Sequence, residues 1–296
     1  MSQPFIAFLV GPTASGKSKI ALELAQKHSM EIINADRMQV YRHLTIGTAK
    51  PSSEDFALVP HHLFDLIDPD QSFSAMDYAT MAREVLNDQG QEKKYLFVGG
   101  SGFYLKALLY PPQDLPKGVA HIEDYVQAYR KILEKDPELK STIHENDHYR
   151  IQRAFFLVSQ GYTPSQLWKQ AADQKPRLQV HWFGIQTPRP QLLTAIAHRS
   201  QTMVDQGLME ETQKVLEQFP ASKPQLEKII GYKQCLDAIE NSSSMSNLVQ
   251  EIARATGKYA KQQMTWFKRN PEILWSSLEH AQDSFSCYIE KETRPS

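Results

Sequence analysis

The hydrophobic pattern divides the chain into short apolar runs separated by longer amphipathic stretches. Helical periodicity marks residues 18–28 and 74–87 among those stretches. Strands that alternate with helices are typical of parallel sheets, so the pattern predicts an α/β fold with a parallel sheet core flanked by helices. Four runs have the length and the β-branched or aromatic content of buried strands, at residues 5–10, 31–35, 95–98 and 180–185.

The middle of the chain departs from this alternation. Residues 111–118 are rich in proline and indicate a linker, and residues 121–174 carry helical patterns without a convincing strand. Strand character returns at 180–185, and the sequence after Pro190 is helical nearly to its end. We therefore expect a core made of residues 1–112 and 179–296, with a helical insertion at 113–178.

Composition narrows the class of protein. The 296 residues are 41% hydrophobic and 23% charged with a net charge of −1, which is ordinary for a globular protein. The two cysteines, Cys235 and Cys287, lack metal-ligand spacing, which excludes a disulfide framework and fits a reducing compartment. The first apolar run is too short for a signal peptide or a membrane span, so we expect a cytoplasmic protein without membrane contact.

A phosphate-binding motif follows the first predicted strand and precedes a predicted helix, which is the context that a P-loop requires. Its glycines let backbone amides surround phosphate oxygens, Lys17 adds a positive charge, and the Ser18 hydroxyl is placed to coordinate Mg²⁺. The motif predicts a bound di- or triphosphate but not the reaction. It comprises Gly11, Pro12, Thr13, Ala14, Ser15, Gly16, Lys17 and Ser18.

The third predicted strand lacks the acid that P-loop NTPases use to hold magnesium. It continues instead into Gly99, Gly100, Ser101 and Gly102, a loop that lets a ligand lie close to the backbone. This weakens an ATPase or GTPase interpretation. A small-molecule kinase stays an alternative because it shares the phosphate grip, and so does a non-catalytic RNA-binding protein with an unused P-loop.

Several motifs together resemble the bacterial tRNA dimethylallyltransferases. The resemblance extends from about residue 5 to residue 275. It implies a P-loop fold adapted from nucleotide kinases, Mg²⁺ as cofactor, and dimethylallyl diphosphate and the tRNA anticodon stem-loop as partners. A monomer is the simplest expectation for the oligomeric state. Besides the P-loop, the motifs are Asp36-Arg37-Met38-Gln39-Val40-Tyr41, Gly47-Thr48-Ala49-Lys50-Pro51, Val98-Gly99-Gly100-Ser101-Gly102-Phe103-Tyr104, Asn146-Asp147 with Tyr149-Arg150-Ile151-Gln152-Arg153, Gly231-Tyr232 and Lys261-Gln262-Gln263-Met264-Thr265-Trp266-Phe267.

The implied reaction moves a dimethylallyl group to N6 of adenosine 37, in tRNAs that read codons starting with U, and releases pyrophosphate. The insertion is implied to be a lid that contacts tRNA. Prenylation of free adenine nucleotides is a nearer alternative, but a basic C-terminal helix and the tRNA-type motifs argue against it.

The resemblance assigns three catalytic residues. Asp36 follows the second predicted strand, at the sheet edge where ligands bind, and would accept a proton from the adenine amine. Arg199 would stabilise the leaving pyrophosphate, and Ser101, where the family usually has threonine, offers a hydroxyl. Without the resemblance, Asp36 is also read as a turn or capping residue, and Arg199 as part of a solvated helix face. Arg37 stands where the family usually has serine, and Ala195 stands where it commonly has arginine.

One C-terminal helix is expected to present a basic face. Arg254, Lys258 and Lys261 fall at helical spacing, with no acid between residues 252 and 269, and aromatic residues interleave. On pattern alone this is also a solvated amphipathic helix. The resemblance also implies that the side-chain amide of Gln39 would read the adenine base after it leaves the stacked tRNA loop. The resemblance assigns tRNA binding to Asp36, Arg37, Met38, Gln39, Tyr149, Arg150, Ile151, Gln152, Arg153, Gly231, Tyr232, Lys258, Lys261, Trp266 and Lys268.

One stretch imitates a zinc site. His144-Glu145-Asn146-Asp147-His148 matches the H-E-x-x-H pattern of metalloproteases, in which both histidines share a helix face. Here Asp147 is typical of a residue that caps a helix carrying Arg150 and Arg153, so we expect no zinc. The His61-His62 pair is interpreted as a loop.

Overall fold

The computed structural model describes residues 4–87, 93–110, 116, 118–172, 174–241 and 244–294. The chain divides into two compact units, Met1–Leu108 with Leu178–Ser296, and Leu109–Arg177. The predicted linker at 111–118 lies largely outside the described residues.

A six-stranded sheet forms the centre of the first unit, in the order β3-β2-β4-β1-β5-β6. Every neighbouring pair is parallel, so the carboxyl ends of the strands meet at one edge. This confirms the predicted α/β fold. The strands are β1 (Phe5–Val10), β2 (Met30–Asn34), β3 (His61–His62), β4 (Lys94–Val98), β5 (His181–Ile185) and β6 (Leu274–Ser276).

The two edge strands correct the sequence prediction. His61 and His62 form β3 rather than a loop, with His61 in register with Ile32 of β2. Likewise, Leu274 pairs with Phe183, so the region after Pro190 is not helical throughout. Strands of two and three residues are too short to show alternation, and they form because an existing sheet edge offers unpaired backbone groups.

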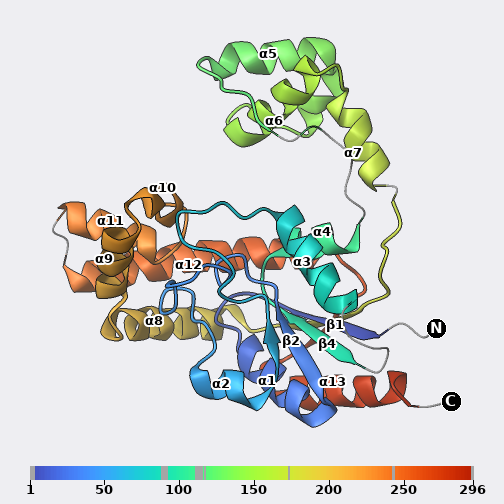
Figure 1. The fold of residues 1–296 in the computed structure, drawn as a ribbon, viewed down its shortest axis with the longest axis vertical. Helices are drawn as coiled ribbons and strands as arrows, with labels where there is room; N and C mark the ends of the chain where they lie inside the picture. Colours follow the sequence, from blue (N-terminus) through green and yellow to red (C-terminus); the bar gives the residue numbers. More distant parts are fainter. Residues whose placement is uncertain are drawn as a thin grey trace. The chain divides into compact units, whose positions relative to one another are not determined.

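Helices cover both faces of this sheet (Figure 1). Helices α1 and α13 bury one face, where the rings of Phe183 and Phe285 stack with their centroids 4.6 Å apart. Helices α3, α4 and α12 lie across the sheet from them (Figure 1). These helices are α1 (Lys17–His28), α3 (Ala75–Asn87), α4 (Gly102–Leu109), α12 (Met245–Phe267) and α13 (Leu278–Glu292).

Further helices complete the first unit, and α8 packs along α12. No helix in the described ranges is long and apolar enough to cross a bilayer. The remaining helices are α2 (Ser53–Leu58), α8 (Arg189–Asp205), α9 (Leu208–Gln218), α10 (Lys223–Leu226) and α11 (Tyr232–Asn241), with a 3₁₀ turn at Pro220–Ser222.

The second unit is helical, with its own core around Ile132, Leu139 and Ile151. Asp147 caps α6, because its Oδ1 accepts a hydrogen bond from Arg150 N at 3.1 Å. The H-E-x-x-H pattern therefore straddles a helix start, and the described residues contain no cluster suited to a metal. The elements are α5 (Tyr125–Lys135), a 3₁₀ turn (Pro137–Ser141), α6 (His148–Ser159) and α7 (Pro164–Ala172).

Candidate functional site

The phosphate loop connects β1 to α1 and opens into a pocket at the carboxyl edge of the sheet. Residues from Thr13 to Ser18 line this pocket, here called the phosphate pocket. Gly16 has a φ of +83°, and a Cβ there would lie 2.7 Å from Leu278 Cδ1 of α13. Glycine suits this position because the backbone is left-handed, and any larger residue would also have to displace the Leu278 side chain.

Lys17 lies folded back over the loop. Its Nζ donates a hydrogen bond to the Pro12 carbonyl at 2.7 Å. Burial lowers the pKa of Lys17 to about 8; the negative charge of Asp36 opposes this shift, and the positive charge of Arg199 adds to it. The ammonium is therefore destabilised in the free protein, and a bound diphosphate would restore the charge balance.

The donors in the phosphate pocket fit a magnesium ion that is held mainly by a ligand. Ser18 is exposed at the start of α1, and Asp36 lines the same pocket. No group of three acidic, histidine or cysteine side chains that could hold a metal ion by itself occurs in the part of the chain that the structure describes. Magnesium takes few protein ligands when phosphate oxygens and water supply the rest.

Asp36 is held in place by the end of β2. Its backbone N–H donates to Asn34 Oδ1 at 2.8 Å, and its own Oδ1 accepts from Met38 N at 2.9 Å. Asn34 is fully buried, and its Nδ2 also donates to the Leu63 carbonyl at 2.9 Å. This network fixes the turn that carries the carboxylate. Sequence reasoning missed Asn34, although a polar residue at the end of an apolar strand was a visible signal.

Ser101 brings the loop after β4 to the same edge. The residue is buried, its N–H donates to the Ala35 carbonyl at 3.1 Å, and its Oγ accepts from Arg37 N at 3.0 Å. No acidic residue follows β4, as predicted. The loop thus contributes a hydroxyl and backbone groups to the site instead of a carboxylate.

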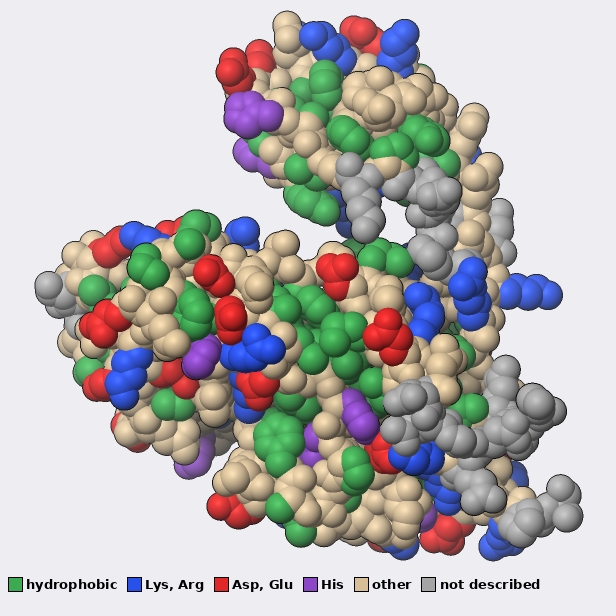
Figure 2. Space-filling model, in the orientation of Figure 1, with side chains coloured by type: hydrophobic (Ala, Val, Ile, Leu, Met, Phe, Trp, Pro, Cys, Tyr) green, Lys and Arg blue, Asp and Glu red, His purple; other side chains and the backbone are tan. Residues whose placement is uncertain are grey.

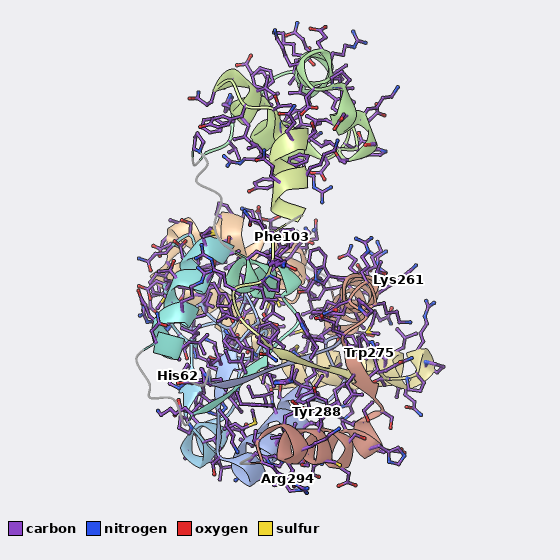
Figure 3. The ribbon with its side chains drawn as sticks, turned by 90° about the vertical axis from the view of Figure 1, so that its right-hand side faces the viewer. His62, Phe103, Lys261, Trp275, Tyr288 and Arg294 are labelled. Carbon is purple, nitrogen blue, oxygen red and sulfur yellow. The ribbon has the colours of Figure 1, made fainter. Side chains whose placement is uncertain are left out.

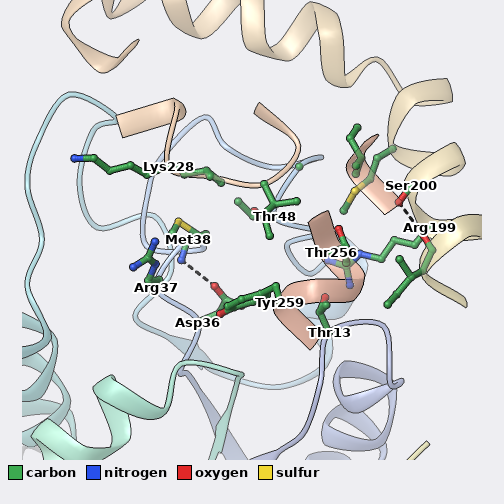
Figure 4. Close-up of a pocket in the computed structure, with 16 residues that line it drawn as sticks. Thr13, Asp36, Arg37, Met38, Thr48, Arg199, Ser200, Lys228, Thr256 and Tyr259 are labelled. Atoms are coloured by element: carbon green, nitrogen blue, oxygen red, sulfur yellow. Dashed lines mark hydrogen bonds between the residues drawn. The ribbon is translucent and has the colours of Figure 1, made fainter. Parts of the chain in front are cut away.

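A second pocket, here called the apolar pocket, adjoins the first (Figure 4). Its apolar wall comes mainly from α8, α12 and the 228–230 segment, and Tyr259 faces it. Burial, followed by the Asp36 charge, raises the pKa of Tyr259 to about 12, against hydrogen bonds to Gln263 and Ser101. Its aliphatic lining is Met38, Ile196, Met203, Ile229, Ile230 and Ile252.

Asp36 and Arg199 line both pockets, together with Thr13 and Thr48. Burial lowers the pKa of the Arg199 guanidinium, while the nearby Asp36 carboxylate acts in the opposite direction. The structure therefore brings the predicted base and the predicted arginine to the junction between the phosphate pocket and the apolar pocket. Ala195 lines the phosphate pocket one helical turn before Arg199.

The loop that contains Gly47 and Thr48 is fixed by Glu211 of α9, a residue that sequence reasoning missed. Its carboxylate accepts hydrogen bonds from the backbone N–H groups of Thr45, Ile46 and Gly47, and from the hydroxyl of Tyr232. A half-buried carboxylate satisfied by several donors holds a loop firmly. Glu211 is distant in sequence from this loop, so no local pattern pointed to it.

Three of the residues assigned to tRNA binding lie around the loop that contains Gly47 and Thr48: Gln39, Gly231 and Tyr232. Tyr232 is fully buried and donates to Glu211 Oε1 at 2.6 Å, and Gly231 packs beside it. Gln39 lines the phosphate pocket, and its Nε2 donates to the carbonyls of Thr48 and Ala49 at 3.1 Å. The amide of Gln39 is therefore oriented with its oxygen available as an acceptor. Arg37 and Met38 line the apolar pocket.

The five assigned residues of the second unit lie on α6. Ile151 is buried in the core of that unit, while Tyr149 is 68% exposed. Gln152 Nε2 donates to the Tyr125 hydroxyl at 2.8 Å, and Arg153 donates to the carbonyls of Pro116 and Gly118. Arg150, in contrast, is exposed beside Asp147. Tyr149 and Arg150 are thus the side chains of this group most open to a partner.

Helix α12 carries the predicted basic residues. Lys258, Lys261 and Lys268 are exposed, and Lys261 extends from the helix in Figure 3. Arg254 pairs with Glu251 at 2.6 Å. On the face drawn in Figure 2, acidic and basic side chains are interspersed, so positive charge does not dominate that view.

An aromatic pair adjoins the loop after β4. Phe103 is 64% exposed, and its ring centroid lies 5.2 Å from that of Trp266 on α12. Sequence reasoning included Trp266 but missed Phe103, although an aromatic residue directly after a glycine-rich loop was a usable signal.

Known proteins share this architecture and sequence. The family model of IPP transferases matches residues 39–270. The tRNA dimethylallyltransferase 1 of Syntrophotalea carbinolica is 35% identical over 285 residues, covering 92% of this chain and 91% of that protein. The tRNA dimethylallyltransferase of Natranaerobius thermophilus is 36% identical over 301 residues, covering 97% and 90%.

Solved structures agree. The tRNA delta(2)-isopentenylpyrophosphate transferase from Staphylococcus epidermidis superposes with a TM-score of 0.71 at 30% identity, covering 98% of this chain and 100% of that chain. A eukaryotic dimethylallyltransferase acting on tRNA shares the fold, with a TM-score of 0.83 at 21% identity, covering 99% and 81%.

Proposed function

Because the chain belongs to the IPP transferase family, we propose that it transfers a dimethylallyl group from dimethylallyl diphosphate to N6 of adenosine 37 in tRNA. The observation that carries this proposal is the position of Asp36 and Arg199, which line both the phosphate pocket and the apolar pocket. A proton acceptor and a cation are therefore available where an allylic diphosphate and a base would meet.

The phosphate loop would bind the diphosphate through its backbone amides and Lys17. During transfer, the bond between N6 and the allylic carbon forms, and the bond between that carbon and the diphosphate oxygen breaks. Negative charge then grows on the departing pyrophosphate, where Lys17 and Arg199 stabilise it. Ser18 is the residue that would hold Mg²⁺ on the diphosphate, with phosphate oxygens and water completing its ligands, and the ion would supply further positive charge there.

Asp36 is the proposed base. The exocyclic amine of adenine loses a proton when N6 gains a carbon, and the Asp36 carboxylate accepts that proton. Asn34 fixes the backbone turn that carries Asp36, and the Met38 N–H donates a hydrogen bond to the carboxylate. Neither contact protonates the carboxylate. The apolar pocket would receive the adenine ring after the base leaves the stacked loop, with the acceptor oxygen of Gln39 nearby.

The RNA would bind along exposed parts of α12 and α4. Lys258, Lys261 and Lys268 offer positive charge for phosphates, and the exposed ring of Phe103 offers a stacking surface for an unpaired base. On the second unit, Tyr149 and Arg150 form a further proposed contact.

The direct test offers dimethylallyl diphosphate, Mg²⁺ and an unmodified tRNA whose loop contains A36 and A37, followed by digestion and mass analysis of nucleosides. We expect N6-dimethylallyladenosine at position 37 only. A folded protein that leaves adenosine 37 unchanged would contradict the proposal. A parallel reaction with AMP, ADP and ATP separates tRNA prenylation from prenylation of free nucleotides.

A further inference from the structure

Gln263 of α12 joins the phosphate loop to the loop after β4. Its Oε1 accepts a hydrogen bond from Thr13 N at 2.9 Å, and its Nε2 donates to the Gly100 carbonyl at 3.2 Å. The residue is 5% exposed, so water does not compete for these bonds. One carboxamide therefore satisfies a donor and an acceptor from two segments far apart in the sequence.

The fit between Gln263 and the second loop is close. A Cβ at position 100 would lie 1.9 Å from Gln263 Nε2, so only glycine allows the backbone to approach this side chain. Thr13, Gly99, Gly100 and Gln263 all line the phosphate pocket. An apolar side chain of similar size would fill the space but leave two buried backbone groups without partners.

We propose that Gln263 is a positioning residue for the diphosphate. It sets the distance between the phosphate loop and the Gly99–Gly100 segment, so that both line the pocket in one fixed arrangement. This role rests on the proposed function, and it predicts an effect on the diphosphate substrate that is separate from any effect on tRNA. Lys258 and Lys261 of α12 are exposed and do not line the phosphate pocket, so they are left in place when Gln263 is changed.

The test uses three variants of the full chain. Gln263→Met removes the hydrogen bonds to Thr13 N and to the Gly100 carbonyl, together with the one to Tyr259, at nearly constant volume. Gln263→Glu keeps an acceptor for Thr13 N but loses the donor to Gly100 when the carboxyl is ionised. Gln262→Met is the matched control, because Gln262 is the exposed neighbour on the same helix. KM for dimethylallyl diphosphate, KM for tRNA and kcat are measured for each, along with the calorimetric affinity for pyrophosphate.

We expect Gln263→Met to raise KM for dimethylallyl diphosphate about tenfold or more, since each unpaired buried group is costly, while KM for tRNA changes less than about threefold. Gln262→Met should match the wild type. Gln263→Glu should also raise KM for dimethylallyl diphosphate at about pH 7, because an ionised carboxylate offers the Gly100 carbonyl no donor.

An unchanged KM for the diphosphate in Gln263→Met would overturn the proposal, as would an equal rise in KM for tRNA. A wild-type KM for the diphosphate in Gln263→Glu at about pH 7 would do so too. If Gln263→Met melts at a much lower temperature than wild type, Gln263→Glu decides. A wild type that binds pyrophosphate but transfers no prenyl group contradicts the proposed function alone, and pyrophosphate affinity then still tests Gln263.

Discussion

The backbone N–H of Arg37 donates a hydrogen bond to Ser101 Oγ at 3.0 Å, which ties the turn after β2 to the loop after β4. The turn carries the proposed base Asp36, and the loop contributes Gly99 and Gly100 to the phosphate pocket. The Ser101 hydroxyl therefore connects the turn that carries the proposed base Asp36 to the loop that would lie beside the departing pyrophosphate.

Replacing that hydroxyl tests the connection. We expect Ser101→Ala to lower kcat/KM by about 5- to 50-fold, because the Arg37 amide loses its partner at a partly buried position. Ser101→Thr retains the hydroxyl, so steady-state kinetics should place it within about threefold of wild type. Equal activity in Ser101→Ala and wild type would show that the connection is dispensable.

Asp36→Asn should remove most turnover and leave tRNA affinity nearly intact. The amide keeps the size of the side chain and can still accept from Met38 N, but it does not take up the amine proton. We expect kcat to fall at least about a hundredfold, measured in single-turnover reactions. A variant that keeps more than about a tenth of the rate would refute the base assignment.

Diphosphate binding should weaken as pH rises through 8. Lys17 has a pKa lowered to about 8 in the free protein, and a bound diphosphate raises that pKa because it stabilises the ammonium. Below pH 7 Lys17 is already charged and its contribution to affinity is constant; above pH 8 binding must take up a proton, so affinity falls up to about tenfold per pH unit.

Calorimetry of pyrophosphate binding in buffers of different ionisation enthalpy measures this proton uptake. Lys17→Arg is the control, because arginine stays charged throughout and the remaining pH dependence is then that of the ligand. Identical proton uptake in the variant and the wild type would assign the titration to another group.

The basic residues of α12 should set the salt dependence of tRNA binding. Lys258→Ala with Lys261→Ala removes two cations, so the slope of log Kd against log salt should drop by about 1 to 2 units. The double variant Lys27→Ala with Lys291→Ala changes α1 and α13, across the sheet, and should leave the slope unchanged. A slope altered by the second pair instead would move the RNA surface to that face.

Phe103 should contribute to tRNA binding through its ring. We expect Phe103→Ala to raise KM for tRNA about five- to fiftyfold with an unchanged KM for dimethylallyl diphosphate, since base stacking on an aromatic ring is worth about 1–3 kcal/mol. Phe103→Trp should retain affinity, whereas Phe103→Leu keeps the apolar surface but loses the stacking. Wild-type affinity in Phe103→Leu would show that an apolar contact suffices.

Local signals in the sequence were enough to predict the central strands and the phosphate loop. β1 was predicted at its observed bounds, because a fully buried strand with an adjoining glycine-rich motif is distinctive. The helix cap at Asp147 was equally visible, since capping depends on neighbours within three residues.

Relationships across long sequence separations were not predictable in this way. The bond from Thr13 N to Gln263 joins β1's loop to α12, and Glu211 holds a loop that precedes it by more than half the chain. Tyr232 belonged to a recognisable motif, but nothing local indicated that its ring is buried rather than exposed. Such features depend on tertiary packing, which the periodicity of one segment does not encode.

The contact between Gly16 and Leu278 has a consequence for how the protein is made. The phosphate loop is synthesised well before α13, which packs against it. Strand β6, which pairs with β5 at the sheet edge, is also made later than the loop. A nascent chain therefore carries the complete phosphate motif before it has the helix that packs against it, and the binding loop acquires its final surroundings only after α13 has been made.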